Sequence, residues 1–193
     1  MSNISLIVGL GNPGKEYAQT RHNAGFWFVE QLADRYGIQL KADPKFHGFS
    51  GRGQIEGHDV RLLLPTTFMN RSGQSVAPFA KFYHISPESI LIAHDELDMD
   101  PGVIRLKTGG GHGGHNGLRD IVPHLGANFH RLRIGIGHPG SKERVAGHVL
   151  NKAPSSEQDL MDAALDHALS KVKILVDGQV ALAMNQINAY KPT

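Results

Sequence analysis

Short apolar runs alternate with longer amphipathic stretches along this chain. Residues 4–10, Ile-Ser-Leu-Ile-Val-Gly-Leu, form an apolar run that ends at glycines, which predicts a buried strand. Apolar residues then recur at helical spacing from Val29 to Tyr36, which predicts a helix that Asn23 caps and Gly37 ends. The Ser-Ser-Glu-Gln segment at 155–158 predicts a capping box at the start of a long helix. By the same patterns, further strands are predicted at 46–55, 60–64, 90–93, 103–107 and 131–136, and further helices at 72–83, 116–125, 155 to about 176 and about 179–188.

The order of these elements predicts the class of fold. Strands alternate with helices throughout residues 1–193 without a repeat or a linker, which indicates a single α/β domain with a largely parallel central sheet. The two strands around Glu56-Gly57-His58-Asp59 are typical of a hairpin, which makes the sheet mixed. We therefore expect a twisted mixed sheet flanked by helices, with ligands beyond the carboxyl ends of its strands.

Composition excludes several kinds of chemistry. The chain has no cysteine, so disulfides, thiolate metal sites and cysteine nucleophiles are ruled out. Its formal charge is only +2, which is too small to indicate nucleic-acid binding by itself. No apolar stretch approaches the roughly 18 residues that span a bilayer, and the first residues lack the features of a signal peptide. We expect a cytoplasmic protein without membrane contacts.

Polar groups follow several of the predicted strands, and two of them suggest acid–base chemistry. His22 lies just before an apolar helix and is the strongest candidate for a general base. Asp95 ends a buried strand, where an unpaired carboxylate would cost several kcal/mol, and it could orient the His22 imidazole. A surface histidine near a helix start and an aspartate capping a turn remain the alternatives on spacing alone.

Three asparagines occupy turn-rich loops after strands. Asn12, Asn70 and Asn116 are each typical turn residues taken singly, and Asn116 could also cap the helix that follows it. Together at strand exits they favour a cleft that recognises polar groups, because each amide both donates and accepts.

Three other kinds of site are weighed against this one. Residues 9–14 match the dinucleotide fingerprint G-x-G-x-x-G, but Pro13 removes a backbone N–H and the helix begins about nine residues too late. A mixed metal site is conceivable from His94, Asp95, His112 and His115, but the glycines between them make a poor cage and no H-E-x-x-H motif is present. There is no G-x-S-x-G elbow for a serine nucleophile. We expect no metal and no cofactor, and direct attack by water with histidine as the base.

Five blocks of the sequence, in order along the chain, resemble the signatures of the bacterial peptidyl-tRNA hydrolase family. The resemblance covers essentially the whole chain, and its motifs are highly specific in combination. The blocks are residues 8–17 with 20–25, residues 65–70 with Ser72-Gly73, residues 94–98, residues 109–118 and residues 131–140.

The resemblance implies a monomeric α/β enzyme that hydrolyses the ester between a peptide and the terminal ribose of tRNA. It implies that His22 is the base, that Asp95 is its partner, and that residues 138–150 form a flexible lid. It also implies a clamp on a tRNA phosphate by Lys107 and Arg133, with Arg133 preferred over Arg131 by strand alternation. Further residues implied to bind the substrate are Asn12, Tyr17, Phe68, Met69, Asn70, His115 and Asn116.

Two other functional classes remain open at this point. One is a non-catalytic RNA-binding module, whose function would survive the loss of His22. The other is a nucleotide- or nucleoside-processing enzyme of similar architecture, which would turn over a free nucleotide or nucleoside.

Overall fold

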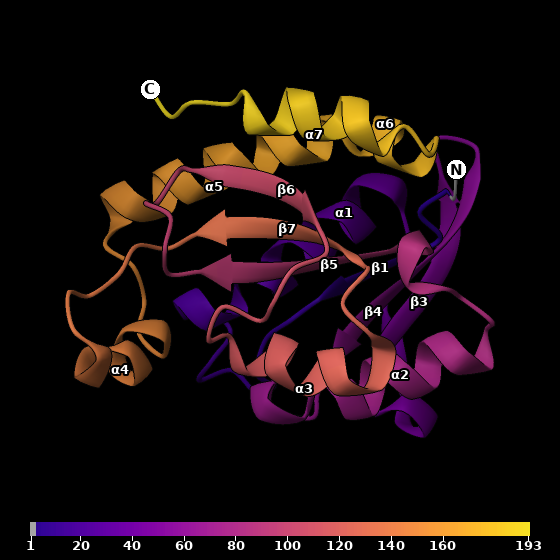
Figure 1. The fold of residues 1–193 in the computed structure, drawn as a ribbon, viewed down its shortest axis with the longest axis horizontal. Helices are drawn as coiled ribbons and strands as arrows, with labels where there is room; N and C mark the ends of the chain where they lie inside the picture. Colours follow the sequence, from indigo (N-terminus) through magenta and orange to yellow (C-terminus); the bar gives the residue numbers. More distant parts are fainter. Residues whose placement is uncertain (1–2) are drawn as a thin grey trace.

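The computed structural model describes residues 3–193, which form a seven-stranded sheet covered by helices on both faces (Figure 1). The strand order is β2-β3-β4-β1-β5-β7-β6. The four central strands run parallel, whereas β2, β3 and β6 join by antiparallel pairing, so the predicted mixed α/β sheet is confirmed. The strands are β1 Leu6–Gly9, β2 Lys41–Asp43, β3 Gly48–Ile55, β4 His58–Pro65, β5 Ile90–Glu96, β6 Ile104–Thr108 and β7 His130–Gly135.

The helices lie in two layers, one on each face of the sheet. Helices α1, α5, α6 and α7 cover one face, and α2 and α3 cover the other (Figure 1). No helix among residues 3–193 is both long and apolar enough to cross a membrane. The helices are α1 Ala24–Tyr36, α2 Gly73–Phe82, α3 Asn116–Leu125, α4 Val145–Val149, α5 Ser155–Ser170, α6 Val172–Val176 and α7 Val180–Asn188.

The central strands are apolar on both faces, which explains their continuous hydrophobic runs. In β1, Leu6 and Val8 belong to the cluster under α2 and α3, whereas Ile7 belongs to the cluster under α1 and α5. Neighbouring residues of a strand point to opposite faces, so a strand covered on both sides needs apolar residues at every position.

Strand β7 lies between two strands that precede it in the chain. It pairs in parallel with β5 and antiparallel with β6. Ile134 of β7 lies opposite Asp95 of β5 on one side and opposite Ile104 of β6 on the other. Within the described part of the chain, β6 is therefore an edge strand that pairs with β7 alone.

Two predictions about helix starts were wrong. Asn23 lies at the N-cap position of α1 but its side chain makes no capping bond; it bonds the backbone N–H and C=O of Asn12 instead, at 2.9 Å each. The capping box at 155–158 is absent, because Pro154 is the N-cap residue and Ser155 is already helical. The long helix also breaks at Lys171 into α5 and α6.

Two short elements were not predicted from the sequence. Strand β2 has only three residues, none of them buried, and helix α4 has only five. Neither is long enough to show a hydrophobic period. Helix α4 lies beyond the carboxyl ends of β5 and β7 (Figure 1), within the predicted lid.

The first turn of α1 lies directly against the sheet backbone, because two glycines leave no side chain between them. A Cβ atom on Gly25 would lie 2.3 Å from the carbonyl oxygen of Ala93 and 2.6 Å from the amide nitrogen of Leu10. A Cβ on Gly9 would lie 2.3 Å from the carbonyl oxygen of Gly25. This contact brings the 3-10 turn η1, Arg21–Asn23, to the carboxyl ends of β1 and β5.

Gly25→Ala is expected to destabilise the fold by about 3 kcal/mol or more, because backbone atoms cannot move aside for the added methyl. Chemical denaturation would measure this change. Gly147→Ala in α4 is the matched control, because its Cβ would meet nothing within 4 Å, and it should be neutral or slightly stabilising. Equal effects of the two substitutions would contradict the close-contact explanation.

Candidate active site

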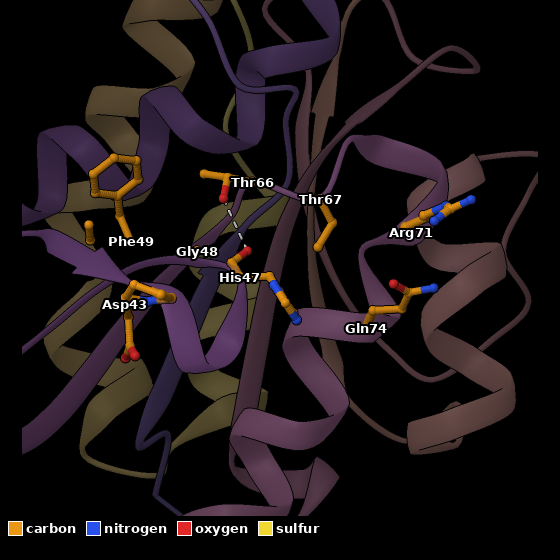
Figure 2. A pocket seen from close by; sticks show the side chains of 10 residues that line it. Asp43, His47, Gly48, Phe49, Thr66, Thr67, Arg71 and Gln74 are labelled. Atoms are coloured by element: carbon orange, nitrogen blue, oxygen red, sulfur yellow. Dashed lines mark hydrogen bonds between the residues drawn. The ribbon is translucent and has the colours of Figure 1, made fainter.

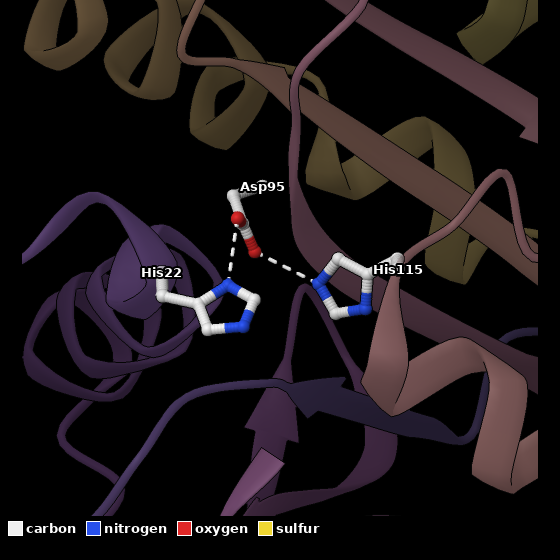
Figure 3. A group of neighbouring side chains, drawn as sticks. All are labelled: His22, Asp95 and His115. Atoms are coloured by element: carbon white, nitrogen blue, oxygen red, sulfur yellow. Dashed lines mark hydrogen bonds and ion pairs between the residues drawn. The ribbon is translucent and has the colours of Figure 1, made fainter. Parts of the chain in front are cut away.

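The carboxylate of Asp95, at the end of β5, is held between two histidines from distant parts of the chain. Its Oδ2 lies 2.8 Å from Nδ1 of His22 on η1, and its Oδ1 lies 2.8 Å from Nε2 of His115, just before α3 (Figure 3). All three side chains are nearly excluded from solvent. The two hydrogen bonds use one carboxylate oxygen each.

The hydrogen bonds fix which nitrogen of each ring carries a proton. His115 is the N-cap residue of α3, and its Nδ1 accepts the backbone N–H groups of Gly117 and Leu118 at 3.1 and 3.3 Å. Its proton must therefore be on Nε2, which donates to Asp95. The carboxylate likewise keeps a proton on Nδ1 of His22, so Nε2 of His22 is left with a free lone pair.

Burial and charge act in opposite directions on this group. Burial alone would lower the pKa of His22, but the charge of Asp95 and its hydrogen bond outweigh burial, so the pKa lies above its ordinary value of 6.5. Burial would raise the pKa of Asp95, yet the two histidines bring it well below its usual range. Asp95 is therefore ionised throughout the physiological range.

The group opens into a cleft of about 400 Å³. Of the predicted site residues, His22, Asp95, His115 and Asn116 line this cleft. The structure brings together these four, which come from three separate segments of the sequence. The other lining residues are Glu96, Leu97, Gly113, Gly114, Arg119, Lys142, Val145, Ala146 and Val149.

The remaining predicted substrate residues lie in the segments after β1 and β4 and do not line the cleft itself. Asn12 is buried, and its Oδ1 accepts the backbone N–H of Met69 at 2.7 Å. Tyr17 and Phe68 form an edge-to-face pair with ring centroids 6.2 Å apart. Asn70 is exposed on the turn that follows. Asn12 thus ties the loop after β1 to the loop after β4.

Lys107 and Arg133 line a separate small pocket of about 90 Å³ beneath the glycine loop, here called the basic pocket. Strand alternation does not separate Arg133 from Arg131, because residues two apart on a strand point to the same face. Both arginines line the pocket. They differ in that Arg131 is buried and donates to the carbonyls of Gly110 and Gly111, whereas Arg133 is half-buried beside Glu96. The other residues of the basic pocket are His94, Glu96, Asp98, Gly111, His112, Gly113 and Leu118.

Several residues of the cleft and one anchor of the lid segment were not predicted from the sequence. Arg119 donates to Oδ1 of Asn116 at 3.2 Å, a contact that the helical spacing of three residues could have indicated. Lys142 and Val149 come from the predicted lid segment. Arg21 is buried and donates to the carbonyl of His148 at 2.8 Å, which attaches that segment to η1. No local pattern marks such a long-range contact.

The histidine–aspartate group fits a metal ion poorly, although its donor atoms lie within 4.8 Å of one another. Both nitrogens of His115 and both oxygens of Asp95 are already engaged in hydrogen bonds. Only Nε2 of His22 is free to bind, and one ligand does not hold a metal ion.

A second hollow of about 460 Å³ lies beside the β2–β3 turn (Figure 2). It is somewhat larger than the cleft but contains no base held by a buried acid. Its lining includes Thr66, whose hydroxyl donates to the carbonyl of His47 at 3.2 Å, and the carboxylate of Asp43 accepts from the hydroxyl of Ser50. The cleft at His22 is therefore the candidate active site.

Comparison with known proteins identifies the family. The family model described as peptidyl-tRNA hydrolase matches residues 6–193. The chain belongs to the peptidyl-tRNA hydrolase family. It is 87% identical to the peptidyl-tRNA hydrolase of Acinetobacter baumannii (strain AYE), with full coverage of both proteins. It is 63% identical to that of Psychrobacter cryohalolentis, with 97% of each chain covered.

Solved structures agree with this membership of the peptidyl-tRNA hydrolase family. A crystal structure of the A. baumannii peptidyl-tRNA hydrolase superposes with a TM-score of 0.99 at 86% identity, covering 100% of this chain and 98% of that one. A purine nucleoside phosphorylase from Toxoplasma gondii, at 10% identity and a TM-score of 0.50, shares the fold alone.

Replacing Asp95 should reverse the direction of the His22 pKa shift. In the native protein we expect NMR titration to give His22 a pKa above 6.5, so protonation of His22 stabilises the fold below about pH 6.5 and this contribution is lost as the pH rises through the folded pKa. In Asp95→Asn the charge is gone and burial remains, so the pKa should fall below 6.5. An unchanged pKa would show that Asp95 does not control this imidazole.

Phe68 adopts a backbone conformation that side chains disfavour, with φ 64° and ψ 154°. Such strain costs of the order of 1–3 kcal/mol, and glycine relieves it. Phe68→Gly should therefore be more stable than Phe68→Ala in thermal unfolding. Phe82 is equally exposed (51% for each) but ends helix α2, so there the order should reverse, with alanine the more stable. The same order at both positions would contradict strain at Phe68.

Proposed function

We propose that this protein hydrolyses the ester bond between the peptide and the 3′-terminal ribose of peptidyl-tRNA, with His22 as general base. The observation that carries the proposal is the free Nε2 of His22, oriented by a buried carboxylate at the cleft of a chain in this family. A histidine with a pKa near neutral is the side chain best suited to take a proton from water.

The reaction follows from the protonation states. Nε2 of His22 takes a proton from a water molecule as the water oxygen attacks the ester carbonyl carbon. Asp95 keeps the ring in the right tautomer and stabilises the imidazolium that forms. The carbon–oxygen bond to ribose then breaks, and His22 returns its proton to the ribose oxygen. The products are a peptide with a free carboxyl group and tRNA with a free terminal hydroxyl.

Amide groups near the cleft are proposed to position the water and to stabilise the oxyanion. Asn116 lines the cleft, and the bond from Arg119 to its Oδ1 orients its amide group. The segments after β1 and β4 are proposed to bind the peptide, through Asn12, Tyr17, Phe68, Met69 and Asn70. Recognition of the first peptide amide there would favour an N-blocked aminoacyl-tRNA over a free one.

Three properties implied by the family resemblance belong to the same proposal. The segment 138–150 acts as a lid, supported by α4 and by Lys142 and Val149 in the cleft lining. A single chain supplies all the residues proposed for the site, which is consistent with a monomer. A cytoplasmic location is supported by the proposed substrate, which is formed during translation.

His22→Ala should fold normally yet lose at least about a hundredfold in kcat, the lower range of general-base effects. Release of free tRNA from an N-blocked aminoacyl-tRNA measures turnover, and His124→Ala, an exposed histidine on α3, is the matched control. A His22→Ala protein that keeps more than about a tenth of the rate would mean that another group is the base. Turnover of free nucleosides by the native protein would favour the nucleoside-processing class.

The basic pocket is proposed to hold the 5′-terminal phosphate of tRNA through Lys107 and Arg133. Lys107→Ala and Arg133→Ala should each raise KM on full-length substrate about tenfold and flatten its salt dependence, but not on a minimal substrate without that phosphate. Lys81→Ala, an exposed lysine on α2, is the control. If the variants lost activity equally on both substrates, Lys107 and Arg133 would act in the chemical step or in stabilising the fold, and not in phosphate binding.

A further inference from the structure

Asn116 and Gly117 form the only Asn-Gly pair in the sequence, and they begin helix α3 at the cleft. Asparagine followed by glycine is the pair most prone to spontaneous deamidation, because glycine has no side chain to obstruct attack by its own nitrogen. Asn116 is exposed, so water can reach its amide group. A chemically labile side chain therefore lies among the residues that line the cleft.

Deamidation at such a pair takes place within the chain and needs only water. The backbone nitrogen of Gly117 attacks the side-chain carbonyl carbon Cγ of Asn116, the Cγ–Nδ2 bond breaks, and the proton lost by the Gly117 nitrogen leaves with Nδ2 as ammonia. Water then opens the cyclic imide at either of its carbonyl carbons. The products are aspartate and isoaspartate, and each carries a carboxylate in place of the amide.

Packing around Gly117 leaves no room for a larger residue. A Cβ atom there would lie 2.7 Å from the sulfur of Met69 and 3.0 Å from Cδ1 of Leu10, and both side chains are buried. The same atom would lie 3.0 Å from Cε1 of His115. A substitution would therefore displace core side chains or the imidazole. The fold thus requires glycine directly after the asparagine of the cleft.

The nitrogen that would attack is already engaged by His115. Nδ1 of this N-cap residue accepts the backbone N–H of Gly117 at 3.1 Å and that of Leu118 at 3.3 Å. The Gly117 nitrogen is thus directed at the imidazole and not at Cγ of Asn116. Arg119 in turn donates to Oδ1 of Asn116 at 3.2 Å and orients the side-chain amide. Both reacting groups are therefore held by neighbours on the first turn of α3.

Asp95 holds the ring of His115 in this orientation. Its Oδ1 accepts from Nε2, which leaves Nδ1 facing the helix. The segment before the ring makes few contacts, because an added Cβ on Gly113 or Gly114 would meet nothing within 4 Å. Local opening of so sparsely packed a segment is the event that would release the Gly117 nitrogen.

We propose that Asn116-Gly117 is a site of spontaneous deamidation and that the imidazole of His115 protects it. His115 therefore has a task separate from its bond to Asp95, which is to keep the Asn116 amide intact over the life of the enzyme. In the deamidated protein a further carboxylate joins Asp95 and Glu96 in the cleft lining, and negative charge there disfavours an oxyanion. The resulting loss of activity rests on the proposed function, whereas the deamidation itself does not.

The experiment measures amide loss and isoaspartate at Asn116 by mass spectrometry of proteolytic peptides, during prolonged incubation in mildly alkaline buffer. It compares the native protein, its denatured chain, His115→Ala and His115→Ser. Serine is a good N-cap acceptor for the same backbone N–H groups but lacks the second nitrogen that donates to Asp95. His115→Ala should deamidate about tenfold faster than the native protein, whereas His115→Ser should stay within about threefold of it, because a cap limits local opening.

His22→Ala removes the other donor to Asp95 and leaves the cap intact, so it should deamidate at the native rate. A native protein that deamidates as fast as its denatured chain would overturn the proposal. Equal rates in His115→Ser and His115→Ala would contradict protection by the cap. Turnover by aged His115→Ala, relative to its starting value, should fall with the fraction of Asn116 lost. Activity that outlasts the amide would contradict only the proposed role of Asn116, because protection by His115 is read from the mass spectra.

Discussion

The buried negative charge of Asp95 is the constraint on which the site depends. A carboxylate removed from water costs several kcal/mol unless donors surround it, and here each oxygen receives one N–H from a histidine. Those histidines come from η1 and from the start of α3, so the charge holds together loops that follow different strands. The arrangement of the cleft therefore depends on neutralising the charge of Asp95. The elements that carry the two histidines must lie close enough to donate to its carboxylate.

Backbone contacts bring the surrounding elements close to Asp95. Gly9 and Gly25 let α1 lie directly on β1 and β5, and Asn23 then joins its side chain to the backbone of Asn12. Asn12 in turn holds the amide of Met69. This chain of contacts runs from the loop after β1 to the turn after β4, so it ties together the loops beside the cleft. The same contacts position the loop that carries His22, whose Nε2 has no protein partner among residues 3–193.

Much of the fold could be predicted from local patterns, and the missing parts have physical reasons. Continuous apolar runs marked β1 and β5, because both of their faces are covered. Strand β2 and helix α4 are too short to show a period. Asn23 was predicted to cap α1 because of its residue type and its position, but its side chain bonds the backbone of Asn12 instead. His22 and Asp95 were proposed as a pair on chemistry, whereas the contact of His115 with the same carboxylate depends on a loop path that no spacing rule describes. Strand alternation could not distinguish Arg131 from Arg133, because a period of two residues puts both on the same face.

The place of β7 in the sheet has a consequence for the order of folding. During synthesis β5 emerges early and pairs with β1, but its other edge stays open until residues 130–135 leave the ribosome. Strand β6 has been made by then and has no strand to pair with, because β7 is its only partner among residues 3–193. A nascent chain that stops short of β7 therefore carries an unpaired strand that is apolar on both faces, the kind of edge that invites pairing with another chain. Strand β7 covers the second edge of β5 and gives β6 its place in the sheet, so both depend on residues 130–135.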